Sequence, residues 1–277
     1  MPLKLMYITN DPAVALIAEA AGVDRIFVDL ETLGKEERQG HMDSVKSHHS
    51  IQDIRALRRC LTKSELLVRI DPIHSGSAEQ IDQVVDAGAD IIMLPMWKTP
   101  EDVARFLELV NGRCRTMLLL ETKEAESCLD AVLALPGVDM VHIGLNDLHL
   151  SYRRNFMFEL LADGTVERIC TRLRAAGKPY GFGGVGRPGG GMLPAEHILG
   201  EHIRLGSQMV ILSRSFCDVA KVGSIEEVKT TFRDGLRDLR TCEAEWEAAG
   251  DGVLEENHRT LCRETAEIAA RMRERKT

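Results

Sequence analysis

The sequence predicts a (β/α)8 TIM barrel with a C-terminal helical extension. Two observations predict this fold: short apolar runs recur eight times along the chain, and amphipathic stretches with helix start and stop signals separate them. Nearly continuous apolar runs are typical of parallel strands that are buried on both faces. Eight such units favour a closed barrel, with an open doubly wound sheet as the structural alternative.

The expected strands share an almost unbroken apolar character and end next to charged or polar residues. They are residues 3–9, 25–31, 65–71, 90–96, 115–121, 139–145, 179–185 and 208–214. The glycine-rich stretch 181–191 falls at and after the seventh strand. It predicts a loop with unusual backbone angles or close approach to a ligand, with a flexible surface loop as the alternative.

Helices are expected between the strands because their boundaries carry recognisable signals. Residues 11–22 begin with Asp11 as an N-cap and Pro12 at the first helical position, and they end at Gly22. Residues 75–90 and 99–112 repeat this arrangement and end in the same way at a glycine.

The chain continues beyond the last expected strand into a charged segment without strand signals. Apolar residues at helical spacing, from Val228 to Leu239, predict a helix over 225–248, and residues 250–252 separate it from a second helix over 253–275. We therefore divide the chain into a barrel domain, 1–218, and a helical extension, 219–277. The extension is expected to pack on its own barrel or to cross to a neighbouring subunit.

Composition excludes several classes of protein. The formal charge of −8 argues against a general binder of nucleic acid or of anionic membranes, since both require a basic surface. Seven cysteines without CxxC spacing indicate reduced thiols, not a disulfide framework or a cysteine zinc site. The first residues lack a signal-peptide pattern and no apolar run approaches the roughly 20 residues that span a bilayer. We expect a cytoplasmic protein.

Charged residues follow the apolar runs, where a β/α barrel places its reactive groups. Glu121 ends the fifth expected strand and Asp147 follows the sixth, so both carboxylates are expected at consecutive strand ends. Two carboxylates plus water form an all-oxygen site that suits Mg²⁺ or Mn²⁺. The alternative is a salt-bridged site without a metal, in which Arg69 is the cation.

Five segments then resemble one family in their order along the chain. The segments IFVDLE (26–31), LLVRI (66–70), IIMLPM (91–96), LLLETKEA (118–125) and HIGLNDL (142–148) resemble the HpcH/HpaI aldolase and citrate lyase β-subunit family. The resemblance covers residues 3 to about 218. It implies a phosphoenolpyruvate/pyruvate-type barrel, a divalent metal (Mg²⁺ or Mn²⁺, with Co²⁺ as a further candidate) and a homo-oligomer, either a trimer or a hexamer.

The resemblance also implies roles for particular residues. Glu121 and Asp147 would bind the metal, and Arg69 would face the enolate oxygen and the substrate carboxylate, with a structural ion pair to Asp29, Glu31 or Asp71 as the alternative for Arg69. Backbone groups of two turns would bind the substrate. These turns contain Pro95, Trp97, Gly144, Leu145 and Asn146.

One departure from the family concerns proton transfer. Family aldolases carry a histidine directly after the glutamate of the second strand, and here Thr32 follows Glu31. We predict that His49 takes this acid/base role from the following loop. His48 and His41 are alternatives, and so is a surface position for all three histidines. A bound water or hydroxide is a further candidate for the base.

The predicted function is that of a metal-dependent class II aldolase. It would reversibly condense or cleave pyruvate or a related 2-oxo acid with an aldehyde, through a metal-stabilised enolate. One alternative is a CoA-ester lyase or thioesterase of the citrate lyase β and malyl-CoA type, which the missing histidine after Glu31 favours. The other alternative is a non-catalytic barrel subunit.

Overall fold

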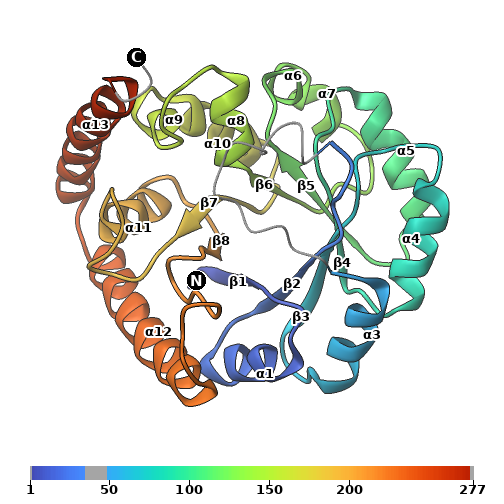
Figure 1. Ribbon diagram of the computed structural model, residues 1–277. Coiled ribbons are helices and arrows are strands. Elements are labelled where there is room, and N and C mark those ends of the chain that lie inside the picture. Colours follow the sequence, from blue (N-terminus) through green and yellow to red (C-terminus); the bar gives the residue numbers. More distant parts are fainter. Residues whose placement is uncertain (1, 35–48, 275–277) are drawn as a thin grey trace. The chain divides into compact units, whose positions relative to one another are not determined.

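Eight parallel strands form a closed barrel in the described residues, 2–34 and 49–274, of the computed structural model (Figure 1). The hydrogen-bonded order follows the chain from β1 to β8, and each strand is followed by one or more helices. The predicted (β/α)8 barrel with additional C-terminal helices is therefore confirmed.

All eight expected strands are present, each somewhat shorter than the apolar run that predicted it. They are β1 (Lys4–Ile8), β2 (Arg25–Asp29), β3 (Glu65–Arg69), β4 (Ile91–Leu94), β5 (Arg115–Leu120), β6 (Met140–Ile143), β7 (Tyr180–Val185) and β8 (Met209–Leu212). Glu31, Asp71 and Glu121 consequently lie just beyond their strands, and Asp147 lies in the first turn of the helix that follows β6.

The helices surround the strands. They are α1 (Pro12–Ala21), α3 (Ile51–Cys60), α4 (Ser77–Asp86), α5 (Pro100–Val110), α6 (Lys123–Ser127), α7 (Leu129–Leu133), α8 (Leu145–Ser151), α9 (Glu159–Ala162), α10 (Thr165–Ala175), α11 (Ala195–Arg204), α12 (Ile225–Glu247) and α13 (Asp251–Glu274). In the region described, no helix combines the length and the apolar character that crossing a membrane requires.

Capping residues explain where several helices begin and end. The Asp11 carboxylate accepts a hydrogen bond from Ala13 N at 2.7 Å, and Gly22 ends α1 in the left-handed region with a φ of 105°. Thr99 and Asp102 form a capping box at the start of α5. The helix α4 differs from the expectation, since its N-cap is Gly76 and no side chain caps it.

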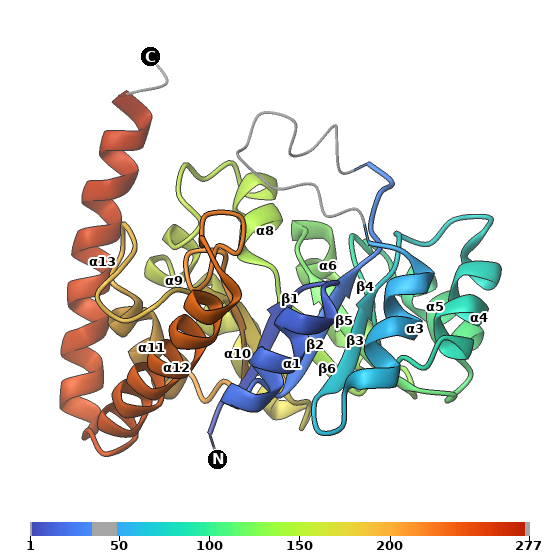
Figure 2. The same ribbon diagram turned by 60° about the horizontal axis from the view of Figure 1, so that its bottom comes forward.

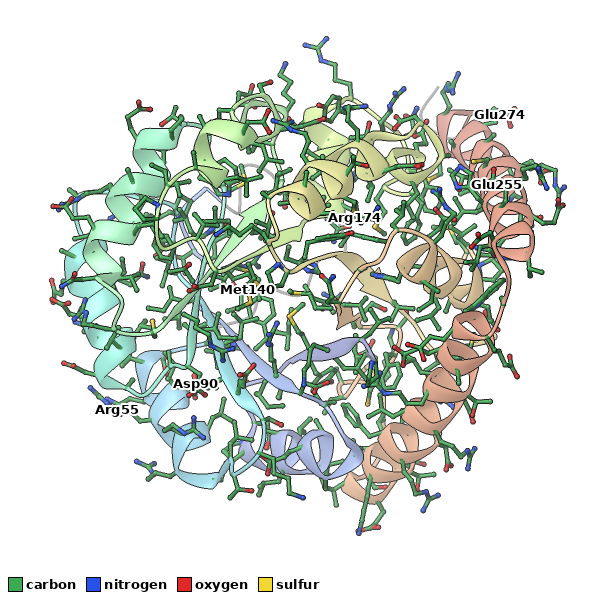
Figure 3. The ribbon with its side chains drawn as sticks, turned by 180° about the vertical axis from the view of Figure 1, so that it is seen from behind. Arg55, Asp90, Met140, Arg174, Glu255 and Glu274 are labelled. Atoms are coloured by element: carbon green, nitrogen blue, oxygen red, sulfur yellow. The ribbon has the colours of Figure 1, made fainter. Side chains whose placement is uncertain are left out.

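Contacts divide the chain into two compact units, Met6–His142 and a second unit of Met1–Leu5 with Ile143–Thr277. In the first unit, α1, α3, α4 and α5 lie outside β2 to β5 (Figure 1). Asp90, labelled in Figure 3, comes directly before β4 and accepts hydrogen bonds from Leu66 N at 2.7 Å and from Arg58 at 2.8 Å. These bonds tie the start of β4 to β3 and α3.

The second unit contains the C-terminal extension. The helix α13 runs beside α9 and α11, and α12 also packs on α11 (Figure 2). Both predicted helices are confirmed, although Asp251 and Gly252 lie inside α13 because the acidic side chain suits the first turn of a helix. The extension packs on a barrel helix of its own chain and groups by contacts with residues 143–218.

Candidate active site

Arg69 lies at the end of β3 and pairs with two carboxylates from the end of β2. Its Nε and NH2 atoms donate to the two oxygens of Asp29, each at 2.9 Å, and NH2 lies 3.4 Å from Glu31 Oε2. The strands place the first pair, since Asp29 and Arg69 are directly opposite in the β2–β3 register. This is the ion pair that the sequence offered as an alternative for Arg69.

A third carboxylate acts on the same guanidinium. Burial would lower the pKa of Arg69, but the charges of Asp29, Glu31 and Glu121 raise the pKa above its usual value. The three acidic residues are each only 3% exposed. Arg69 is therefore permanently charged, and it lies among three buried carboxylates.

Glu121, directly after β5, is held by the backbone of the preceding βα turn. Its Oε1 accepts a hydrogen bond from Met96 N at 3.0 Å. Met96 has a φ of 53°, which is unusual for a residue other than glycine. The turn after β4 thus adopts a strained conformation at the point where it contacts Glu121.

The same turn contains two of the residues predicted to bind substrate. Pro95 has no backbone N–H, and the N–H of Met96 is bound by Glu121, so Trp97 supplies the remaining N–H of this turn. The Trp97 side chain is 2% exposed, and none of the described residues accepts a hydrogen bond from its indole N–H.

Asp71 holds the turn that leaves β2. Its Oδ1 accepts hydrogen bonds from the backbone N–H groups of Thr32, at 2.7 Å, and Leu33, at 2.8 Å. The Thr32 hydroxyl donates to the same oxygen at 3.2 Å. Thr32 is therefore bound to Asp71 through both its backbone and its side chain.

His49 is the predicted acid/base that falls within the described residues, and it lies beside this group. Its Nδ1 accepts a hydrogen bond from Asp29 N at 3.0 Å. In this geometry the neutral ring carries its proton on Nε2. The alternatives His41 and His48 fall in the range 35–48, outside the described residues.

The second unit contains the other predicted site residues, at the start of α8. Gly144 precedes this helix, Leu145 is 1% exposed, Asn146 is exposed and Asp147 is 9% exposed in the first turn. Gly183 of β7 has a φ of 53°, and a Cβ there would lie 2.7 Å from the Leu145 side chain. The glycine of β7 thus permits close packing against the predicted substrate turn.

The predicted metal pair takes Glu121 from one unit and Asp147 from the other, so it remains a prediction. Among the residues described, no group of three or more His, Cys, Asp or Glu side chains could hold a metal ion. The prediction requires only two carboxylates, with water and substrate completing the coordination.

Met96 and Thr122 contact the predicted site residues, yet the sequence did not single them out. A signal was available for Thr122, because a threonine before Lys-Glu-Ala is typical of a helix N-cap, and Thr122 caps α6. The left-handed conformation of Met96 has no sequence signal, since methionine rarely adopts it.

A closed β/α barrel with charged residues directly after its strands defines an enzyme of the TIM-barrel class. The sequence model described as HpcH/HpaI aldolase/citrate lyase matches residues 4–182. The chain therefore belongs to the HpcH/HpaI aldolase/citrate lyase family, and it is a carbon–carbon lyase of the aldolase type.

Individual relatives are distant in sequence. The chain is 23% identical to a hydroxypyruvate/pyruvate aldolase from Roseovarius nubinhibens, over 62% of this chain and 73% of the relative. It is 27% identical to a 2-keto-3-deoxy-L-rhamnonate aldolase from Salmonella paratyphi B, over 61% of this chain and 69% of the relative. The fold is similar to the crystal structure of an HpcH/HpaI aldolase from Desulfitobacterium hafniense, with a TM-score of 0.57, 18% identity and coverage of 86% of this chain and 93% of that one.

Proposed function

We propose that this aldolase is a class II enzyme that uses a divalent metal to form and break a carbon–carbon bond next to the keto group of pyruvate or a related 2-oxo acid. Glu121 and Asp147 are the proposed protein ligands. Mg²⁺ or Mn²⁺ is the proposed ion, and Co²⁺ is a third candidate. An aldehyde is the second substrate.

The observation that carries this proposal is the burial of two carboxylates at consecutive strand ends. Glu121 is 3% exposed and directly follows β5, and Asp147 is 9% exposed in the first turn of α8, which follows β6. Burial of a carboxylate is costly unless it is paired or hydrogen-bonded. A hard divalent cation matches the oxygen chemistry of these two residues.

The chain's own residues account for the rest of the chemistry. A divalent ion bound by the substrate's keto and carboxylate oxygens would stabilise the enolate. Arg69 remains charged and is held in place by Asp29, so its guanidinium supplies a fixed positive charge beside the reacting group. His49, whose Nδ1 accepts from the Asp29 backbone N–H, is the proposed acid/base residue. To transfer a proton at Nε2 the ring would exchange its hydrogen bond with Asp29, so that Nδ1 could carry a proton.

Two further properties are part of the proposal. The family resemblance implies a homo-oligomer, either a trimer or a hexamer, and we also propose that the protein is cytoplasmic. No nucleic-acid or membrane partner is proposed, in keeping with the formal charge of −8.

The proposal is tested by deuterium exchange at the methyl group of pyruvate, measured by proton NMR in D₂O with Mg²⁺, Mn²⁺ or Co²⁺ added. Enolate formation exchanges the methyl protons without requiring the unknown aldehyde. Exchange is expected with at least one metal and is expected to fall by at least about 100-fold in Glu121→Gln, because this variant removes a ligand charge.

The control is the metal-free protein, treated with EDTA, and the same protein after the metal is restored. Exchange that survives EDTA, or no exchange with any of the three metals, would contradict the proposal. If exchange is absent but a CoA ester is cleaved, the protein is a CoA-ester lyase and not a class II aldolase. Thr32, in place of the histidine that the resemblance leads us to expect, favours this alternative.

A further inference from the structure

Two consecutive residues of the turn after β4 bind two consecutive residues at the end of β5. The Met96 N–H donates to Glu121 Oε1 at 3.0 Å, and the Thr122 hydroxyl donates to Trp97 O at 3.2 Å. Both bonds join the turn after β4 to the residues that follow β5, and in each bond donor and acceptor are 25 residues apart in the chain. We call this pair of bonds the β4–β5 clamp.

The hydrogen bond from Met96 requires an unfavourable backbone conformation of this residue. Left-handed backbone is unfavourable in a residue with a Cβ, because the Cβ comes too close to the following carbonyl oxygen. The φ of 53° is observed in Met96, whose N–H binds Glu121. Strain of this kind persists where surrounding contacts determine the conformation, and it is concentrated at functional sites.

In the other half of the clamp, the Thr122 hydroxyl acts as both a hydrogen-bond donor and an acceptor. The Oγ1 atom accepts from Ala125 N at 3.1 Å, which caps α6, and donates its single proton to Trp97 O. Thr122 is 4% exposed, so water does not readily replace either bond. The hydroxyl therefore fixes the turn after β4 relative to the residue that directly follows Glu121.

We propose that Met96 and Thr122 are positioning residues that hold the Glu121 carboxylate in the orientation needed to bind the metal. This inference rests on the proposed function, because it assigns a purpose to Glu121 as a ligand. A carboxylate oxygen that already accepts a backbone N–H has fewer rotamers available, so less side-chain entropy is lost when the ion binds. Partners of this kind are typically worth 10- to 100-fold in metal affinity.

Two matched pairs of substitutions test the clamp. Thr122→Val keeps the branched shape but removes the hydroxyl, whereas Thr122→Ser keeps the hydroxyl. Met96→Val places a β-branched residue where left-handed backbone is strongly disfavoured, whereas Met96→Asn introduces a residue that tolerates it. Each disruptive variant thus has a conservative partner at the same position.

Mn²⁺ binding is measured by tryptophan fluorescence in a Trp246→Phe background. The chain has two tryptophans, so the remaining signal comes from Trp97 in the clamped turn. Both valine variants are expected to raise the Mn²⁺ Kd by roughly 10- to 100-fold, and the serine and asparagine variants to stay within about threefold of the parent. Pyruvate methyl exchange at saturating Mn²⁺ is expected to recover much of its rate.

Each outcome decides between the two proposals. If the parent binds Mn²⁺ and both valine variants bind it equally well, the clamp is wrong and the proposed function stands. If the parent binds neither Mn²⁺ nor, in the same titration, Mg²⁺ or Co²⁺, both are wrong. Circular dichroism verifies folding, and should one valine variant unfold, the pair at the other position decides.

Discussion

Arg69 has a structural contact whose geometry also suits the role that we propose for it. Its planar guanidinium donates through two nitrogens to the two oxygens of Asp29, while Glu31 and Glu121 lie close enough to raise its pKa. A lysine would preserve the charge but would present a single ammonium group on a flexible chain. The two hydrogen bonds to Asp29, in addition to the charge, fix the orientation of the guanidinium.

Arg69→Lys keeps the positive charge but loses the bidentate geometry, so this variant tests the two contributions separately. The pyruvate exchange rate should fall by about 100-fold, since misplacing one fixed electrostatic contact in an active site typically costs this much. The Mn²⁺ affinity should change little, because the net charge around Glu121 is unchanged. Exchange kinetics and a Mn²⁺ titration measure the two effects, and an equal loss in both would contradict the separation.

Among the elements, α11 contacts both helices of the C-terminal extension. Gly200 of α11 lies where α12 and α13 approach, so a Cβ there would lie 2.5 Å from Asn257 Nδ2 and 3.2 Å from Trp246. Asn257 is itself fixed, because it donates to His197 O at 3.0 Å and its Oδ1 lies 2.6 Å from His197 Nδ1. The close approach of these helices depends on a residue without a side chain.

Gly200→Ala is expected to destabilise the protein by about 1–3 kcal/mol, despite the higher helix propensity of alanine, because the added methyl overlaps a fixed side chain. Urea unfolding measures the change. The control is Gly252→Ala near the start of α13, where a Cβ meets nothing within 4 Å. That variant should be stabilised by about 0.5–1 kcal/mol, and similar behaviour of both variants would refute the packing argument.

At the scale of the whole molecule, titratable groups limit stability on both sides of neutral pH. Burial alone would raise the pKa of three carboxyls, but hydrogen bonds outweigh it and lower the pKa below 4.5. These are Glu19, bound by the backbone of residues 62–64, Glu65, bound by Arg25 and Arg115, and Glu201, bound by His258 and Arg204. Burial raises the pKa of the Cys114 and Cys242 thiols to about 11 and of Cys170 to about 12.

These shifts predict a stability plateau between about pH 5 and pH 9. A carboxyl with a lowered pKa stabilises the fold above its unfolded value of 4.5, and this contribution is lost as the pH falls further. A thiol with a raised pKa has the opposite effect, because above 9.0 the unfolded chain loses the proton that the folded chain retains. Urea midpoints measured from pH 3 to pH 11 should decline at both ends, and a continuous rise toward pH 11 would contradict the thiol assignment.

The fold and the candidate site residues could be predicted from the sequence because their signals are local. Buried parallel strands leave uninterrupted apolar runs, and caps such as Asp11 and Thr99 leave polar residues at fixed offsets from helix starts. Charged residues after the strands identified Arg69 and Glu121 as candidates, since a barrel places its reactive groups at those ends.

Contacts between distant segments could be decided only by the tertiary structure. The bond from Met96 to Glu121, the bond from Asp29 to His49 and the packing of α13 on α11 join residues separated along the chain. No periodicity encodes such contacts, because they depend on which side chains the closed barrel brings within hydrogen-bonding distance. The sequence by itself determined the order of the elements and the chemistry of their ends, and the tertiary structure determined which of those groups hold one another in place.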